Sequence, residues 1–439
     1  MAIILENAHA SLVIQPEQAT YGFYSQADER ALTDLRVSVS AFRHGRLFTS
    51  LTDDWGIYTY DTNGSDLLTL VLGPDEHKLQ YTLEFHLLPA VCAFTLKLRI
   101  SNQGPAPVFL EKISLAKKIA RARTTPDTFL GIHGSNIKDR LLLSNGWQSW
   151  SPTRVYRHGM MQFRSAFPPM IAPMVEYPGT MAGLRDYEFV SDGFGVIGDS
   201  AKGCAVVAGF LSQTQYFGSV GINLSAGKPN LVEVWESGEA TRLDPDHRVV
   251  TDPLYFELTA LDDNKVLDHY YHCLSQQTNA RVPASSPAGW CSWYQFGQNI
   301  NETTLLENLN HAKANQATLP IQLFQIDDGF ETKVGDWFSL KPGFENGLGA
   351  LSDAIRENGY QPGLWLAPFI IENGTKLIRD HPDYLLRGLN GQPVNAGYGW
   401  NGMAKALDMT HPGAFDYVMT VSDPGLRDWK FPYLKLDFL

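Results

Sequence analysis

Cysteine is scarce in this sequence. The 439 residues contain four cysteines, Cys92, Cys204, Cys273 and Cys291, and no two of them form a CxxC pair. This usage excludes a disulfide framework and argues against a structural zinc site. We therefore expect no metal, and a reducing cytoplasm is the expected compartment.

Excess positive charge and long apolar runs are also missing. The chain has 35 Lys and Arg against 47 Asp and Glu, so its formal net charge is −12. Such a chain repels phosphate backbones, which argues against a nucleic-acid partner. No apolar run approaches the roughly 20 residues that span a bilayer. We therefore expect no membrane partner. The first residues, MAIILE, lack the basic start of a signal peptide, so we do not interpret them as one.

Aromatic and apolar residues are plentiful. Hydrophobic residues make up 44% of the chain, which is enough for a real core and excludes wholesale disorder. Aromatic residues make up 12%, including 10 Trp, as in a sugar-binding surface or a large β core. At about 150 residues per domain, the length predicts two or three domains.

The first 260 residues have the rhythm of β-structure. Segments 79–85 and 94–100 alternate apolar and polar residues, which is typical of half-buried antiparallel strands. Turn signals rich in Gly, Asn and Asp separate such segments. Many short strands predict a sandwich, and the length exceeds that of one immunoglobulin-like domain. We therefore predict an N-terminal β domain with two large sheets.

The rhythm changes near residue 261. Apolar residues between 266 and 274 recur at helical spacing, and the Pro- and Ser-rich segment 281–287 follows as a linker. We therefore predict a β domain with a connecting helix over residues 1–280 and a second domain over 281–439.

Strands and helices alternate in the second domain. Apolar strands are predicted near 290–293, 321–326, 363–368 and 433–438, with Asn301 capping one intervening helix and Gly359 ending another. Repeated βα units are typical of a parallel sheet or a (β/α) barrel. A complete (β/α)8 barrel needs about 250 residues. The chain therefore has room for about four strands, the first half of a (β/α)8 TIM barrel.

Chemistry-bearing side chains stand at the ends of these strands. Asp327 and Asp328 end the second strand, Trp365 lies in the third, and Lys435 and Asp437 lie on one face of the fourth. In a βα barrel the carboxyl ends of the strands form the active site. Lys435 favours the carboxylate form of Asp437, as a nucleophile needs, and the acidic pair suits sugar hydroxyls.

Each of these signals also has a structural interpretation. Asp-Asp-Gly after a strand is often a turn with a helix cap, and Lys-x-Asp is often a structural ion pair. Trp290 fits a core position as well as a pocket wall. The order of the signals on successive strands is what favours a site.

At these strand ends and in the segments around them, the sequence resembles glycoside hydrolase family 36, the α-galactosidases of the melibiase superfamily. The resemblance covers residues 288–439 in order, and two looser matches precede it. The matching segments are 289–294 (GWCSWY), 324–329 (FQIDDG), 335–337 (GDW), 362–365 (PGLW), 367–368 (AP), 381–383 (HPD), 407–408 (LD) and 433–438 (YLKLDF), with 145–152 (NGWQSWSP) and 234–238 (VWESG) in the first half.

The resemblance implies a β-supersandwich followed by a (β/α)8 barrel. It also implies retaining hydrolysis of terminal α-linked galactose from melibiose- or raffinose-type oligosaccharides, without a metal or organic cofactor. Asp437 matches the family nucleophile, and Lys435 matches a lysine that binds ring hydroxyls. Asp327 and Asp328 match the pair that holds the galactose. Three tryptophans match pocket positions more loosely, namely Trp365, Trp290 and Trp150.

The acid/base of the family lies on a strand after the nucleophile, and the sequence stops two residues after Asp437. We therefore expect the acid/base to be absent and the chain alone to have little turnover. Pro424 and Gly425 predict a shortened or rebuilt helix before the fourth strand. Unpaired edges of a four-stranded sheet predict association, and a homo-oligomer is one form of it.

Two other functions remain open from the sequence. A galactosyl-transferring relative such as a raffinose synthase would use the same nucleophile, and the acceptor would decide between the two. A non-catalytic sugar-binding protein would keep Asp327, Asp328, Trp365 and Lys435 without turnover.

Overall fold

The structure is a computed structural model with two compact units. It describes residues 2–52, 55–56, 58–118, 130, 134–148, 151–162, 188–224, 232–262, 265–388, 390–400 and 402–438. The first unit ends at Arg281, and Val282 begins the long continuous part of the second. No helix among these residues is long and apolar enough to cross a membrane.

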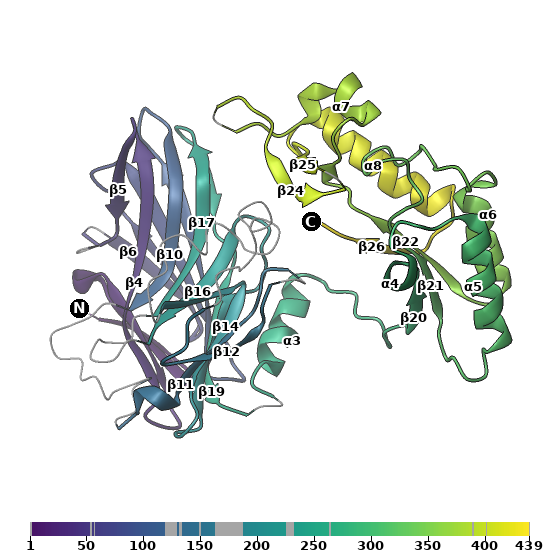
Figure 1. The fold of residues 1–439 in the computed structure, drawn as a ribbon. Helices are drawn as coiled ribbons and strands as arrows, with labels where there is room; N and C mark the ends of the chain where they lie inside the picture. Colours follow the sequence, from purple (N-terminus) through teal and green to yellow (C-terminus); the bar gives the residue numbers. More distant parts are fainter. Residues whose placement is uncertain are drawn as a thin grey trace. The chain divides into compact units, whose positions relative to one another are not determined.

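The first unit consists of two large antiparallel sheets (Figure 1). The described strands of one sheet are β1 (Ile3–Glu6), β2 (Ala10–Gln15), β3 (Thr20–Ser25), β4 (Ala31–Arg43), β5 (Arg46–Ser50), β10 (Val108–Lys118), β13 (Glu188–Asp192), β16 (Phe217–Asn223) and β17 (Val232–Leu243). Those of the other are β6 (Tyr58–Asn63), β7 (Leu67–Leu72), β8 (Leu79–Leu87), β9 (Ala93–Asn102), β11 (Arg140–Ser144), β12 (Arg154–Arg157), β14 (Phe194–Asp199), β15 (Cys204–Phe210), β18 (Arg248–Val250) and β19 (Leu254–Ala260).

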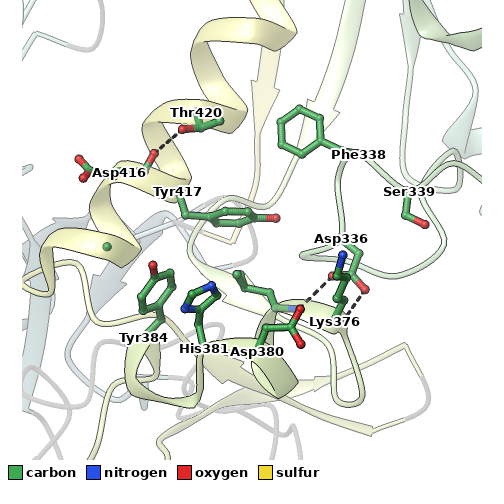
Figure 2. A pocket seen from close by; sticks show the side chains of 12 residues that line it. Asp336, Phe338, Ser339, Lys376, Asp380, His381, Tyr384, Asp416, Tyr417 and Thr420 are labelled. Carbon is green, nitrogen blue, oxygen red and sulfur yellow. Dashed lines mark hydrogen bonds between the residues drawn. The ribbon is translucent and has the colours of Figure 1, made fainter.

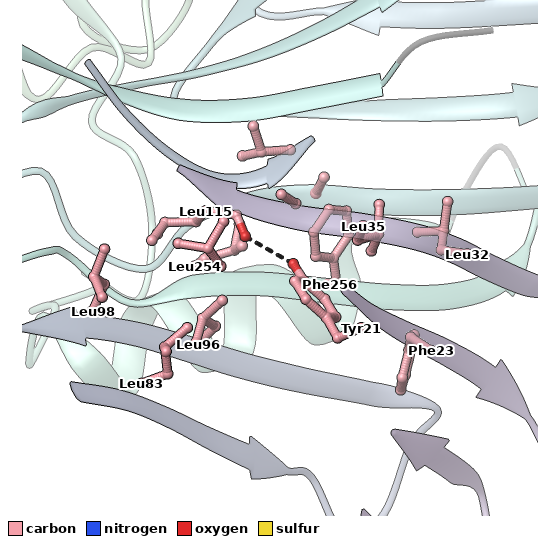
Figure 3. Close-up of a cluster of buried hydrophobic side chains, with 14 of the residues drawn as sticks. Tyr21, Phe23, Leu32, Leu35, Leu83, Leu96, Leu98, Leu115, Leu254 and Phe256 are labelled. Atoms are coloured by element: carbon pink, nitrogen blue, oxygen red, sulfur yellow. Dashed lines mark hydrogen bonds between the residues drawn. The ribbon is translucent and has the colours of Figure 1, made fainter. Parts of the chain in front are cut away.

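Alternation in the sequence sets which side chains enter the core between these sheets. Buried residues alternate strictly along β8 and through most of β9, which confirms the two strands predicted from their period. Aromatic residues from both sheets meet there: the rings of Phe23 and Phe94 pack edge to face with their centroids 4.7 Å apart. Figure 3 shows the buried Tyr21 hydroxyl donating to the Leu115 carbonyl at 2.9 Å. The sandwich prediction is confirmed.

The connecting helix also forms as predicted. α3 (Asp268–Gln277) buries Tyr270, whose hydroxyl donates to the carbonyl of Phe210 at 2.7 Å. Its packing against Tyr255 attaches the helix to the β sandwich rather than to the second unit.

The second unit is built on a parallel sheet with the order β20-β21-β22-β26 (Figure 1). These strands are β20 (Gly289–Cys291), β21 (Leu323–Ile326), β22 (Gln361–Leu366) and β26 (Tyr433–Leu436). The described helices around them are α4 (Trp293–Phe296), α5 (Glu302–Ala314), α6 (Gly347–Glu357), α7 (Lys376–Asp380) and α8 (Pro412–Arg427), and the 3-10 turn η3 (Pro382–Tyr384) follows α7. The four predicted strands are confirmed in the predicted order.

Local signals fix the ends of the helices between the strands. The Asn301 side chain accepts from the Thr304 amide at 2.9 Å and so caps α5. Gly359 has a φ of +89° just beyond α6, where a left-handed residue ends a helix. The shortened helix predicted from Pro424 and Gly425 is wrong, because the backbone of α8 runs on to Arg427. Burial of Val418 and Val421 on α8 outweighs the local propensity.

The segment between β22 and β26 has structure of its own. A small antiparallel sheet contains β23 (Ile370–Ile371), β25 (Gly402–Ala406) and β24 (Asn395–Gly399). The sequence analysis does not predict these three short strands. The β24–β25 hairpin places Trp400 at its turn.

Candidate active site

One face of the parallel sheet carries the predicted polar side chains. Side chains two residues apart on a strand share a face, and registered residues of parallel strands lie side by side. Gln325 is registered with Cys291 and Gly363, and Trp365 is registered with Lys435. Asp327 follows Gln325 by two positions. The strand period therefore brings Asp327, Trp365 and Lys435 together at the carboxyl ends of the strands.

Asp327 is the centre of a hydrogen-bonded network. Its side chain is 2% exposed, and its Oδ2 lies 2.9 Å from Lys435 Nζ. The same oxygen accepts from Gln325 Nε2 at 2.6 Å and from the Cys291 thiol at 3.2 Å. Oδ1 accepts from the Asp328 amide at 3.0 Å. A carboxylate has about four acceptor sites, so the protein itself satisfies Asp327.

The ion pair determines the charge of Lys435. Burial opposes the ammonium form, but the hydrogen bond and charge of Asp327 outweigh it and raise the pKa of Lys435. The burial of Cys291, followed by the negative charge of Asp327, raises the pKa of the thiol to about 11. Lys435 is therefore a permanent cation here, and Cys291 is a neutral donor.

Asp437 lies just beyond β26 and is held by the neighbouring strand. Its Oδ2 accepts from Trp365 Nε1 at 3.1 Å, and its Oδ1 accepts from the Phe438 amide at 3.0 Å. The Asp437 amide donates to the Leu366 carbonyl at 2.9 Å. Lys435 forms its ion pair with Asp327, and the negative charge of Asp437 makes a smaller contribution to the raised pKa of Lys435. Each carboxylate oxygen of Asp437 retains acceptor capacity.

Asp328 is held by residues from three loops. Gln298 Nε2 lies 3.0 Å from Oδ1 and 2.9 Å from Oδ2, and Trp400 Nε1 donates to Oδ2 at 2.7 Å. The buried Glu331 shares a further hydrogen bond with it. Asp328 is 3% exposed, so this cluster shields it from water.

Gly329 allows the close approach that forms this cluster. It has a φ of +124°, and a Cβ there would lie 2.7 Å from the Cα and carbonyl oxygen of Gln298. We expect Gly329→Ala to destabilise the second unit by about 2–3 kcal/mol, because it adds backbone strain and a clash. Urea unfolding measures this loss. The matched control is Gly391→Ala, where φ is +74° with no atom within 4 Å, and its cost should be about 1 kcal/mol.

Glu331 makes the stability of this region depend on pH. Burial, and then the hydrogen bond and charge of Asp328, raise its pKa to about 8. The folded state therefore binds a proton that the unfolded state releases between the ordinary pKa near 4.5 and the raised one. This contribution to stability is fully present below pH 4.5 and is lost as the pH rises through 8.

We expect Glu331→Gln to be as stable as the parent at pH 5 and more stable at pH 8.5. The amide keeps a donor for Asp328 but cannot ionise. The substitution should remove a pH dependence of the unfolding free energy of at most about 1.4 kcal/mol per pH unit. Unfolding free energies at the two pH values measure it, and an unchanged pH slope would contradict the assignment. Glu357→Gln on the exposed end of α6 is the control.

One of the predicted tryptophans does not join this cluster. Trp290 is registered with Phe324, on the face of the sheet opposite to Gln325, and its ring stacks on Phe324 with centroids 4.3 Å apart. The pocket-wall interpretation of Trp290 is therefore corrected to a packing position, because the strand period turns it away from the carboxylates. Trp150 lies outside the described residues.

Several members of the cluster were not predicted. The period of two offers a signal for Gln325 and Cys291, since both share the face of Asp327. Glu331, Gln298 and Trp400 come from irregular segments and have no periodic signal. Among the residues described here, no group of three or more His, Cys, Asp and Glu side chains is arranged to hold a metal ion.

A separate cavity of about 690 Å³ lies between α7, α8 and the segment 336–339. Figure 2 shows the ring of Tyr417 between Phe338 and the pair Tyr384 and His381. None of the residues predicted from the strand ends lines this cavity. The candidate active site is therefore the cluster of carboxylates at the ends of the strands.

In this chain a β sandwich precedes a parallel βα sheet whose strand ends carry acidic side chains. Residues 267–438 match the model of the Melibiase family. The chain is related to the glycoside hydrolase family 36 α-galactosidases, as the resemblance implied. It is 23% identical over 395 residues to α-galactosidase 1 of Pediococcus pentosaceus, covering 87% of this chain and 49% of the relative. The chain thus spans about half the length of that curated relative.

Solved structures confirm the fold. The crystal structure of the family 36 α-galactosidase AgaB from Geobacillus stearothermophilus aligns with a TM-score of 0.67 at 17% identity, covering 99% of this chain and 64% of that one. A variant of AgaA from the same organism, in complex with raffinose, aligns with a TM-score of 0.65 at 16% identity, covering 99% and 65%. The β-supersandwich and partial (β/α)8 barrel predictions are confirmed at the level of fold.

Proposed function

We propose that this chain carries the nucleophile and the sugar-holding groups of a retaining α-galactosidase. The carrying observation is that two hydrogen-bonded pairs, Trp365–Asp437 and Lys435–Asp327, lie side by side at the strand ends of a segment that matches the Melibiase family. Raffinose bound to the AgaA variant supports raffinose-type oligosaccharides as substrates. We further propose that the protein acts in the cytoplasm, because all four cysteines are free thiols, and that it forms a homo-oligomer.

In this mechanism a carboxylate oxygen of Asp437 attacks the anomeric carbon of galactose. The bond from that carbon to the leaving oxygen breaks, and its electron pair stays on the leaving oxygen. Trp365 holds the Asp437 carboxylate through its indole N–H, and Lys435 supplies positive charge beside it. Water then releases galactose from the ester with retention of configuration.

The second carboxyl group of the mechanism protonates the leaving oxygen and later activates water. By resemblance it lies on a strand after the nucleophile, and β26 is the last strand described here. We therefore propose that this chain alone transfers galactose to Asp437 from an activated leaving group but hydrolyses the ester slowly. A transferring relative would pass the same ester to a sugar acceptor instead of water.

Dinitrophenyl α-galactoside tests this proposal, because its leaving group needs no protonation. We expect rapid release of about one equivalent of dinitrophenol per chain, followed by slow turnover. The α-glucoside and the β-galactoside are the matched controls and should give no such burst. Galactose binding without any burst would support the non-catalytic sugar-binding function instead.

A further inference from the structure

Trp400 has a backbone conformation that its side chain disfavours. It occupies the turn between β24 and β25, where Gly399 and Gly402 are paired, and its φ is +47°. Two-residue turns of this kind favour Gly, Asn or Asp, and a bulky residue with positive φ is an outlier. Such outliers persist where other contacts hold them, and they cluster at functional sites.

The contacts that hold Trp400 lie in the candidate active site. Its Nε1 donates to Asp328 Oδ2 at 2.7 Å. Its ring packs edge to face on Phe438, with centroids 5.1 Å apart, and lies 6.4 Å from the ring of Trp365. The hairpin turn therefore covers Asp328 beside the residues that hold the nucleophile.

Trp400 also occupies acceptor capacity that a sugar would need. Asp328 has about four acceptor sites, and Gln298, Glu331 and Trp400 all bind to it. The backbone of Gln298 approaches closely at Gly329, and Glu331 is 2% exposed. Trp400 is half-buried at a strained turn. Of these three donors, Trp400 combines partial exposure with a strained backbone, so we take it as the one that a ligand displaces.

We propose that the Trp400 indole N–H occupies the place on Asp328 that a ring hydroxyl of galactose takes, so that Trp400 competes with the sugar and limits its affinity. The inference rests on the proposed galactose site. It makes Trp400 a residue that sets affinity and selectivity. A ligand must offer a hydroxyl that replaces the indole N–H on a carboxylate, and a deoxy sugar cannot do so.

Trp400→Phe tests the proposal, because it removes the N–H and keeps an aromatic ring. We expect galactose to bind about tenfold more tightly in calorimetry, since the competing hydrogen bond to a charged acceptor is gone. Trp429→Phe, on a ring that packs against Phe338, is the matched control and should leave the Kd unchanged. If the Phe variant does not fold, galactose binding is measured with Trp400→Gly instead, because glycine adopts a positive φ without strain.

The outcomes separate this inference from the proposed function. Tighter binding by the Phe variant supports it, because loss of a structural contact or of a sugar contact would weaken binding. Equal or weaker binding, with galactose clearly bound by the parent, would overturn the inference alone. No galactose binding by either protein would overturn the proposed function and the inference with it.

Discussion

Replacing Asp437 by Asn should abolish the burst of dinitrophenol from dinitrophenyl α-galactoside, lowering its rate roughly 10⁴-fold or more. An amide of the same shape still accepts from Trp365 Nε1, so the change removes charge and nucleophilicity with little change in packing. Rapid-quench or stopped-flow measurement of the first turnover reports the chemical step directly. A burst that survives this substitution would remove Asp437 from the role of nucleophile.

Asp383→Asn is the matched control for this experiment. Asp383 belongs to the same unit, is exposed, and forms a 3.4 Å contact with His411 Nε2 away from the strand ends. We expect its burst to equal that of the parent. An equal loss in both variants would indicate a general effect of removing a negative charge from the second unit.

Lys435→Met should destabilise the second unit by about 2–3 kcal/mol. The methionine keeps the apolar stem but leaves the buried Asp327 carboxylate without its cation. Breaking a buried pair costs about 3–5 kcal/mol, and we expect less because Lys435 is one-third exposed. Hydrogen exchange of peptides from β21 and β22 during urea titration reports this unit separately from the β sandwich.

Two further variants make this stability prediction specific. Lys430→Met removes an exposed lysine whose Nζ lies 3.1 Å from Asp353, and it should cost about 0.5 kcal/mol or less. Adding Asp327→Asn to Lys435→Met removes the unpaired charge and should recover part of the lost stability. If Lys435→Met and Lys430→Met cost the same, the buried ion pair does not stabilise the sheet.

The sequence predicts the regular framework of this protein well, because short-range rules determine it. Alternation predicts β8 and β9, and the Asn301 cap and the Gly359 terminator bound their helices. The two-residue period of the strands brings four predicted side chains to one face, namely Asp327, Lys435, Trp365 and Asp437. These features depend on residues a few positions apart, which a sequence displays directly.

Contacts made by irregular segments could not be predicted in the same way. The bond from Trp400 to Asp328 joins residues 72 positions apart, across a hairpin that the sequence does not indicate. The face of the sheet on which Trp290 lies depends on the register between β20 and β21, which the sequence does not show. The backbone of α8 continues through Pro424 because tertiary burial, which local propensity does not contain, stabilises it.

The most direct test of the central claim is the mass of the protein after reaction with dinitrophenyl α-galactoside. Slow hydrolysis should let the covalent ester accumulate, so the intact chain should gain the mass of one galactosyl group. Peptide mapping should locate that group on Asp437, and the Asp437→Asn protein should gain nothing. A galactosyl group on another residue, or an unmodified chain after a full burst, would contradict the account.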